Sequence, residues 1–176
     1  MANKQALRDL QTRLAERMKQ VRTEQPGRSW LAVDIAGHGL LIALRQAGEI
    51  FKLGVVLPVP HTQAWMAGVV NLRGGVYTVL DLGVFLGLRP APLAPPPPQA
   101  RLVALNAALE VNGALLVDRL EGLRHAADMQ VVVESVDNAP QPVFAPARWQ
   151  DAAGRVWQEI DLAELADLPQ FLEITG

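Results

Sequence analysis

From residue 30 onward, the chain consists of short apolar runs that are repeatedly interrupted by glycine and proline. The first of these runs alternates Leu31, Val33 and Ile35 with smaller or charged residues, a pattern typical of a β-strand. Many short strands with few long helices favour small β-barrels over a layered α/β sheet. We therefore predict a mainly β fold of two small barrels of roughly five strands each.

Glycine and proline breaks also delimit the remaining predicted elements. Further strands are expected at residues 40–44, 55–57, 101–105, 114–117 and 131–133. Asn112 and Gly113 are expected to form the turn before residues 114–117. The pattern indicates a crossover at residues 46–53, one helical turn at residues 64–67, and a hairpin at residues 68–80.

Two aspartates are placed to cap short helices. Asp81 precedes an apolar segment that runs to Leu86, and Gly87 can end that helix. Asp161 precedes a leucine-rich tail, which predicts a short C-terminal helix.

Residues 1–26 have a different pattern from the rest of the chain. Apolar residues recur there at steps of three and four, which predicts an amphipathic helix, and Pro26 ends it: Leu7, Leu10, Leu14, Met18 and Val21. Its apolar stripe can pack on the body of the protein, or it can dock a partner or a second copy.

Residues 27–176 are expected to form the main domain, with residues 89–100 as a semi-rigid connector between its two halves. This segment, RPAPLAPPPPQA, is dominated by prolines that impose an extended geometry.

The composition excludes several classes of function. With 16 basic and 18 acidic residues, the net charge of -2 leaves no basic excess for nucleic-acid binding. The absence of cysteine excludes disulfides, thiolate metal sites and cysteine nucleophiles. The charged N-terminus does not resemble a signal peptide, and no apolar run is long enough to span a bilayer, so we expect a cytoplasmic protein.

The search for catalytic and ligand sites is mostly negative. His38, His61 and His125 are far apart and lack metal-ligand spacing, so neither a metal nor a cofactor is expected. The glycines beside Arg73 do not match a phosphate-binding loop. The string at residues 79–83, VLDLG, weakly resembles an aspartic-protease loop, and Asp81 would then need a symmetric dimer to supply the second carboxylate.

Residues 58–88, PVPHTQAWMAGVVNLRGGVYTVLDLGVFLGL, resemble the CheW-like adaptor domains of bacterial chemosensory systems. The match lies in the G-V-x-N-x-R-G hairpin, the V-x-D-L segment and the closing L-G-L, and residues 113–119 are similar to the family's G-x-x-V-D-x-V segment. The N-terminal helix and the residues from Trp157 onward are similar to the PilI-type members, which serve type IV pilus twitching motility.

This resemblance implies two small five-stranded, SH3-like β-barrels with a groove between them, and no catalysis. It implies an adaptor that couples the tip of a methyl-accepting chemoreceptor to the regulatory domain of a CheA-type histidine kinase, within membrane-associated receptor arrays. A flagellar chemotaxis adaptor is the alternative output.

The resemblance also implies candidate contact residues. The family's kinase contacts map onto Val56, Gly68 and Arg73. The receptor groove is expected to involve Val33, Leu44 and Val117. Arg73 suits a contact because its planar guanidinium can bind carboxylates or carbonyls. The alternative is that Arg73 only braces its own hairpin.

Overall fold

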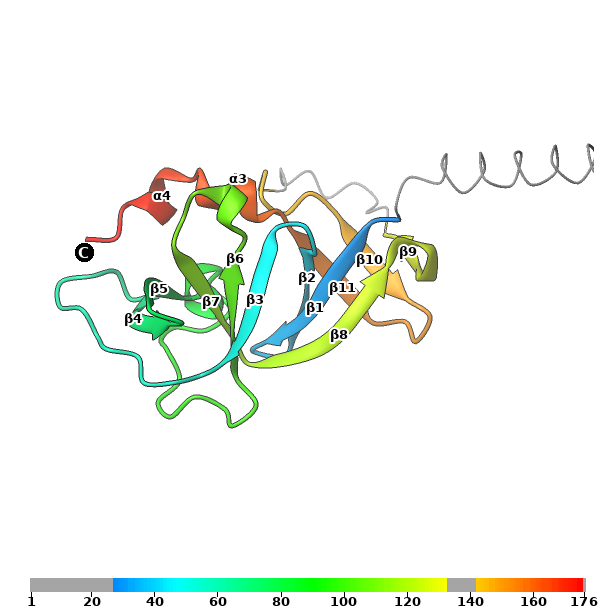
Figure 1. Ribbon diagram of the computed structural model, residues 1–176. Coiled ribbons are helices and arrows are strands. Elements are labelled where there is room, and N and C mark those ends of the chain that lie inside the picture. The colour runs from blue at the N-terminus through cyan, green and yellow to red at the C-terminus, as the bar shows by residue number, and fades with distance from the viewer. Residues whose placement is uncertain (1–26, 133–141, 176) are drawn as a thin grey trace, which may run out of the picture.

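A computed structural model describes residues 27–132 and 142–175. It is mainly β, and its two curved sheets lie side by side (Figure 1). The predicted N-terminal helix lies outside the described residues. No helix within the described part of the chain is long and apolar enough to cross a membrane.

The first sheet has six strands in the order β8-β1-β2-β11-β10-β9. These are β1 (Ser29–Ile35), β2 (His38–Ala43), β8 (Arg119–His125), β9 (Met129–Val131), β10 (Arg148–Asp151) and β11 (Val156–Ile160). We predicted five strands here. The sheet has one more, and its strands β8, β10 and β11 were not predicted because they have mixed exposure and lack a simple apolar alternation.

The second sheet has the predicted five strands, in the order β3-β6-β7-β5-β4. These are β3 (Ala47–Lys52), β4 (Met66–Leu72), β5 (Gly75–Asp81), β6 (Arg101–Leu105) and β7 (Gly113–Val117). The predicted hairpin is confirmed as β4 and β5. The crossover predicted at residues 46–53 is β3, and residues 55–57 contribute one isolated bridge, between Leu57 and Val69. Strand β4 begins within residues 64–67, where a helical turn was predicted.

Both predicted helix caps are confirmed. Asp81 accepts a hydrogen bond from the Val84 amide at the start of α2 (Leu82–Phe85). Asp161 accepts from the amides of Ala163 and Glu164 at the start of α3 (Leu162–Ala166). A further short helix, α4 (Pro169–Leu172), follows, and single turns of 3-10 helix occur at η1 (Ala107–Leu109) and η2 (Ala126–Asp128). Helix η1 separates β6 from β7, so their connection is longer than the predicted Asn-Gly turn.

The proline-rich segment does not separate the two halves. It joins α2 to β6, and the strands on either side, β5 and β6, belong to the same sheet. Its two ends are also part of the interior, because Arg89 and Ala100 are buried. Only the middle of the segment behaves as the exposed connector that the prolines predict.

One core joins the two sheets. Its largest buried cluster contains residues of β1 and β2 together with residues of β5, β6 and β7: Leu31, Val33, Ile35, Leu40, Ile42, Leu80, Val103, Leu105, Leu115 and Val117. Each buried aliphatic side chain of this kind contributes about 1.5–3 kcal/mol through its removal from water. The sheets are therefore held against each other by shared hydrophobic packing.

Candidate functional site

Asp81, the carboxylate of the protease hypothesis, is sealed inside the protein. Its residue is 0% exposed, and its Oδ1 accepts from the Val84 amide at 3.1 Å and from the Arg89 guanidinium at 2.8 Å. A carboxylate in this position has no surface to offer a substrate. The described residues also contain no group of three or more histidine or acidic side chains placed to hold a metal ion.

Arg73 occupies the turn between β4 and β5 with a left-handed backbone, at φ 49°. Its side chain is 75% exposed, and its Nη2 lies 2.5 Å from Oε1 of Glu49 on β3. Its guanidinium carbon lies 6.0 Å from the ring centroid of Phe51, also on β3. The turn itself is closed by Asn71, whose Oδ1 accepts from the Gly74 amide at 2.9 Å. Arg73 therefore reaches a different strand, and Asn71 braces the hairpin.

Gly68 permits a close approach between two backbone segments. At φ 141° it lies at a register shift in β4, and a Cβ there would be 2.2 Å from the Leu57 carbonyl oxygen and 2.9 Å from Val56 Cγ1. The approach lets Leu57 and Val69 exchange two backbone hydrogen bonds of 2.8 Å. Gly68 thus fixes the segment that carries Val56, and that segment covers the outer edge of β4.

Apolar side chains are exposed around this corner of the second sheet. Val55 is 80% exposed, Val76 64% and Leu57 60%. A hollow of about 530 Å³ between β3 and β4 has Val55 and Arg73 in its lining. We call Val55, Leu57, Arg73 and Val76 the Arg73 surface. Exposed apolar side chains gathered around an arginine are typical of a protein-binding surface.

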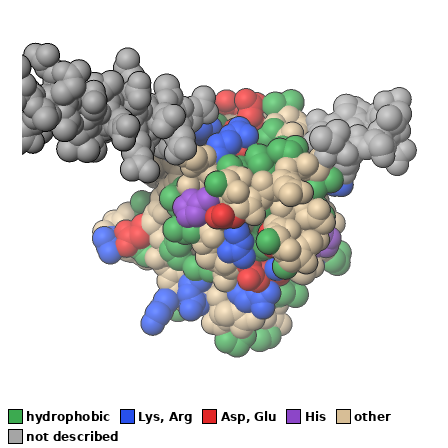
Figure 2. Space-filling view, turned by 90° about the vertical axis from the view of Figure 1, so that its right-hand side faces the viewer, with side chains coloured by type: hydrophobic (Ala, Val, Ile, Leu, Met, Phe, Trp, Pro, Cys, Tyr) green, Lys and Arg blue, Asp and Glu red, His purple; other side chains and the backbone are tan. Residues whose placement is uncertain are grey.

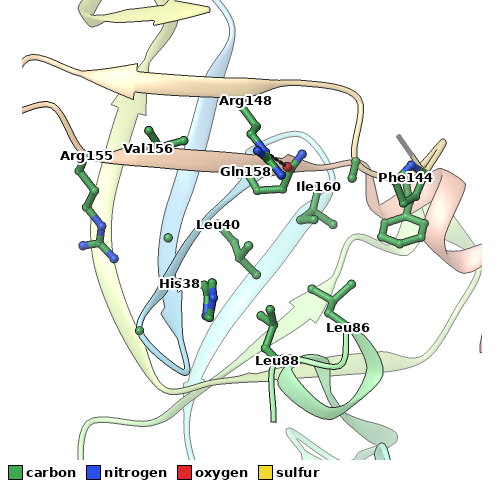
Figure 3. Close-up of a pocket in the computed structure, with 14 residues that line it drawn as sticks. His38, Leu40, Leu86, Leu88, Phe144, Arg148, Arg155, Val156, Gln158 and Ile160 are labelled. Atoms are coloured by element: carbon green, nitrogen blue, oxygen red, sulfur yellow. Dashed lines mark hydrogen bonds between the residues drawn. The ribbon is translucent and has the colours of Figure 1, made fainter. Parts of the chain in front are cut away.

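A second hollow lies between the sheets, with a volume of about 560 Å³ (Figure 3). Its lining comes from the β1–β2 turn and β2, from the residues after α2, and from β10, β11, the turn between them and the chain before β10: Gly37, His38, Gly39, Leu40, Leu86, Leu88, Pro142, Phe144, Ala145, Arg148, Arg155, Val156, Gln158 and Ile160. We call it the inter-sheet groove. Apolar side chains form its walls, while His38, Arg148, Arg155 and Gln158 supply its polar groups.

The groove arginines are held by neighbouring groups. Arg155 donates to Oδ2 of Asp34 at 2.6 Å, and its guanidinium carbon lies 4.2 Å from the ring centroid of Trp157. Arg148 donates from Nε to Oε1 of Gln158 at 3.1 Å.

On the side of the protein that Figure 2 shows, basic and acidic side chains lie beside one another and do not separate into patches of a single sign. That face offers no continuous basic surface for a phosphate backbone.

The sequence-predicted groove residues fall in different places. Val33 and Val117 are both 0% exposed in the shared core, so their side chains have no surface to offer a partner. Leu44 is 43% exposed, but it lines a different hollow, near residues 27–30. None of the residues that line the inter-sheet groove was predicted as a groove residue, although Leu86 and Leu88 belong to the L-G-L motif, because three distant stretches of chain form the groove.

Comparisons with known proteins agree on one family. The model of the CheW-like domain matches residues 29–170. Protein PilI of Pseudomonas aeruginosa is 27% identical over 135 residues, which are 67% of this chain and 74% of that protein. A probable chemotaxis protein CheW of Rhizobium etli is 33% identical over 106 residues, or 59% of this chain and 64% of that protein.

The fold is also that of a solved relative. The crystal structure of the scaffolding protein TtCheW from Thermoanaerobacter tengcongensis superposes with a TM-score of 0.64 and 18% identity, covering 84% of this chain and 97% of that one. Together with the family match over most of its length, this means that the chain belongs to the CheW-like family, the adaptor scaffolds of chemotaxis-type signalling.

Proposed function

We propose that this protein is a non-enzymatic adaptor that couples a methyl-accepting chemoreceptor to a CheA-type histidine kinase. The observation that carries the proposal is the presence of two candidate contact surfaces that share no residue, the Arg73 surface and the inter-sheet groove. An adaptor needs two such surfaces because it must hold two partners at once. Its work is to fix their relative geometry.

The Arg73 surface is the proposed contact for the regulatory domain of the kinase. Val55, Leu57 and Val76 would be removed from water on docking, and Arg73 would supply a planar donor. Val56 and Gly68 contribute indirectly. Gly68 lets residues 55–57, which carry the exposed Val55 and Leu57, lie close to β4. Exposed ion pairs such as Arg73–Glu49 contribute about 0–1 kcal/mol, so the arginine can exchange Glu49 for a partner's carboxylate at little cost.

The inter-sheet groove is the proposed contact for the receptor's helical hairpin tip. Apolar walls between two sheets suit the apolar face of a helix, which docks through side chains one turn apart. The protein would then be cytoplasmic and held at membrane receptor arrays through this contact.

Type IV pilus twitching motility is the proposed output, supported by the similarity to PilI. Flagellar-type chemotaxis is the second candidate, supported by the higher identity to the Rhizobium CheW over a shorter stretch. Deletion of the gene separates the two: loss of twitching with normal swimming supports the first, and loss of swimming alone supports the second.

Paired variants test the two-surface proposal. Val156→Glu puts a charge into the groove, and Val131→Glu is its control, because Val131 is a similarly exposed residue of the same sheet outside the groove. We expect Val156→Glu to weaken binding of a purified receptor hairpin and leave kinase-domain binding unchanged, whereas Val131→Glu changes neither. Equal loss of both partners in Val156→Glu would contradict separate surfaces.

A further inference from the structure

A buried charged cluster lies below the surface, and none of its residues lines the inter-sheet groove or belongs to the Arg73 surface. It consists of Arg89, Asp81 and Asp118, whose side chains are 7%, 0% and 13% exposed. We call these three residues the buried triad. Charges so deep in a protein are costly unless they are paired, so their arrangement calls for a specific role.

Arg89 binds both carboxylates through its planar fork. Its Nη1 lies 2.8 Å and 2.9 Å from the two carboxylate oxygens of Asp118. Its Nη2 and Nε lie 2.8 Å and 3.2 Å from Oδ1 of Asp81. One guanidinium thus joins the end of β5 to the junction between β7 and β8, where the chain passes from one sheet to the other.

Each carboxylate in turn holds one wall of the groove. Asp118 Oδ2 accepts from the amide of Ala36 at 2.8 Å, in the β1–β2 turn that leads into Gly37 and His38. Asp81 Oδ1 accepts from the amide of Val84, at the start of the helix that leads into Leu86 and Leu88. These two walls face each other across the groove (Figure 3).

The space for the guanidinium depends on Gly83. A Cβ at this position would lie 3.0 Å from Arg89 Nε and 3.1 Å from its guanidinium carbon. The Gly83 carbonyl also accepts from the amides of Leu88 and Arg89 at 2.8 Å and 3.2 Å, which folds the chain back over α2. A larger residue at position 83 would therefore displace the Arg89 guanidinium.

The triad carries one positive and two negative charges. Burial by itself lowers the pKa of Arg89, but the hydrogen bonds and charges of Asp118 and Asp81 outweigh burial and raise that pKa above its ordinary value. The guanidinium therefore stays charged. Among the described residues, Asp81 Oδ2 has no hydrogen-bond partner.

We infer that Arg89 is a positioning residue for the inter-sheet groove, holding the β1–β2 turn and the residues after α2 at the separation that binding requires. The binding part of this inference rests on the proposed use of the groove, whereas the positioning part does not. A lysine cannot replace the arginine in this role, because its single ammonium cannot hold two carboxylates bidentately at once.

The test uses Arg89→Lys, which keeps a cation in the cluster and removes the fork. The control is Arg101→Lys, because Arg101 lies on β6, outside the groove, and donates a hydrogen bond to the adjacent carbonyl of Ala100. Thermal unfolding of both variants fixes a temperature at which each is fully folded. All further measurements are made at that temperature.

Hydrogen exchange tests directly whether Arg89 positions the two walls of the groove. In Arg89→Lys we expect peptides that cover residues 34–38 and 82–90 to exchange about tenfold faster, the scale of losing one charge-assisted hydrogen bond. Peptides from β6 and β7 should exchange as in the wild type. Unchanged exchange at residues 34–38 and 82–90 overturns the inference, as does uniformly faster exchange over the whole chain.

Titration of a purified receptor hairpin reads the binding role. We expect Arg89→Lys to bind it about tenfold more weakly than the wild type and Arg101→Lys, with kinase-domain binding unchanged. Normal hairpin binding despite faster local exchange overturns the inference. If the wild type itself does not bind the hairpin, the proposed use of the groove fails, and the exchange result alone decides whether Arg89 positions the walls.

Discussion

Replacing Gly68 with alanine puts a methyl group where the backbone of a neighbouring segment already lies. The added Cβ would be 2.2 Å from the Leu57 carbonyl oxygen, far inside van der Waals contact. Because that atom belongs to the backbone, no side-chain rotation can relieve the overlap. Leu57 must move away from β4, and the two hydrogen bonds that it exchanges with Val69 must stretch or break.

The magnitude follows from two costs. A φ of 141° is open almost only to glycine, and an alanine held there costs about 1–3 kcal/mol. Each lost backbone hydrogen bond adds about 0.5–1.5 kcal/mol. With two such bonds at stake, we expect Gly68→Ala to lower the free energy of unfolding by roughly 2–6 kcal/mol. The variant should also weaken kinase-domain binding, because the displaced segment carries Val55 and Leu57.

Gly74→Ala is the matched control. Gly74 lies in the same hairpin with a positive φ of 87°, but its added Cβ meets nothing within 4 Å. We expect a cost of about 1–2 kcal/mol from backbone strain alone. Urea unfolding of both variants gives the comparison, and hydrogen exchange at residues 53–59 locates the change. Equal destabilisation by the two substitutions would refute the close-approach role of Gly68.

Three further predictions concern other parts of the molecule. Arg73→Ala should weaken kinase-domain binding by about 2 kcal/mol while changing the free energy of unfolding by less than about 1 kcal/mol, because its ion pair is exposed. Calorimetric titration measures the loss of binding, and urea unfolding measures the loss of stability. A large loss of stability with normal binding by the folded fraction would show that Arg73 is structural. The pKa of Asp151 lies below its ordinary value of 3.8, chiefly because its carboxylate accepts a hydrogen bond from Trp157. Burial acts in the opposite direction, and the amides of Arg155 and Ala153 lower the pKa further. The ionised form therefore stabilises the fold above about pH 4, and this contribution disappears as the pH falls through the lowered pKa. The stability difference between the wild type and Asp151→Asn should shrink below pH 4, and a difference independent of pH in urea unfolding would count against the pairing. The purified protein should also show no peptide hydrolysis, and turnover that Asp81→Asn abolishes would overturn the adaptor account.

The parts of the fold that the sequence predicted correctly are local ones. The alternation of Leu31, Val33 and Ile35 identified β1, and the glycines beside Arg73 identified the β4–β5 hairpin. Asp81 and Asp161 marked two helix starts, because capping depends only on residues within one turn. These signals need no knowledge of what lies opposite in the sheet.

The errors came from contacts between distant parts of the chain. Strand β3 mixes exposed and half-buried residues and holds its place through pairing with β6, which its own sequence does not reveal. The proline-rich segment was predicted to separate two halves, but β5 pairs in parallel with β7 and keeps both of its ends in one sheet. Arg89 looked like part of that connector, although two buried carboxylates hold it in the interior.

The predictions of site residues also succeeded where they depended on local sequence and failed where they depended on distant contacts. Arg73 was predicted to lie exposed at a bend, and it does. The resemblance placed the groove among strand residues, but a strand pattern does not distinguish core residues from groove residues, and Val33 and Val117 are both core. The groove requires β2 to pair in parallel with β11, a contact between residues more than a hundred positions apart. No local pattern predicts that pairing.

The central claim is that one chain holds two different partners at once. Size-exclusion chromatography with light scattering, on a mixture of this protein, the kinase regulatory domain and the receptor hairpin, tests it most directly. The account predicts a complex that contains all three, with Arg73→Ala losing only the kinase domain and Val156→Glu losing only the hairpin. Displacement of one partner by the other from the wild-type protein would contradict it.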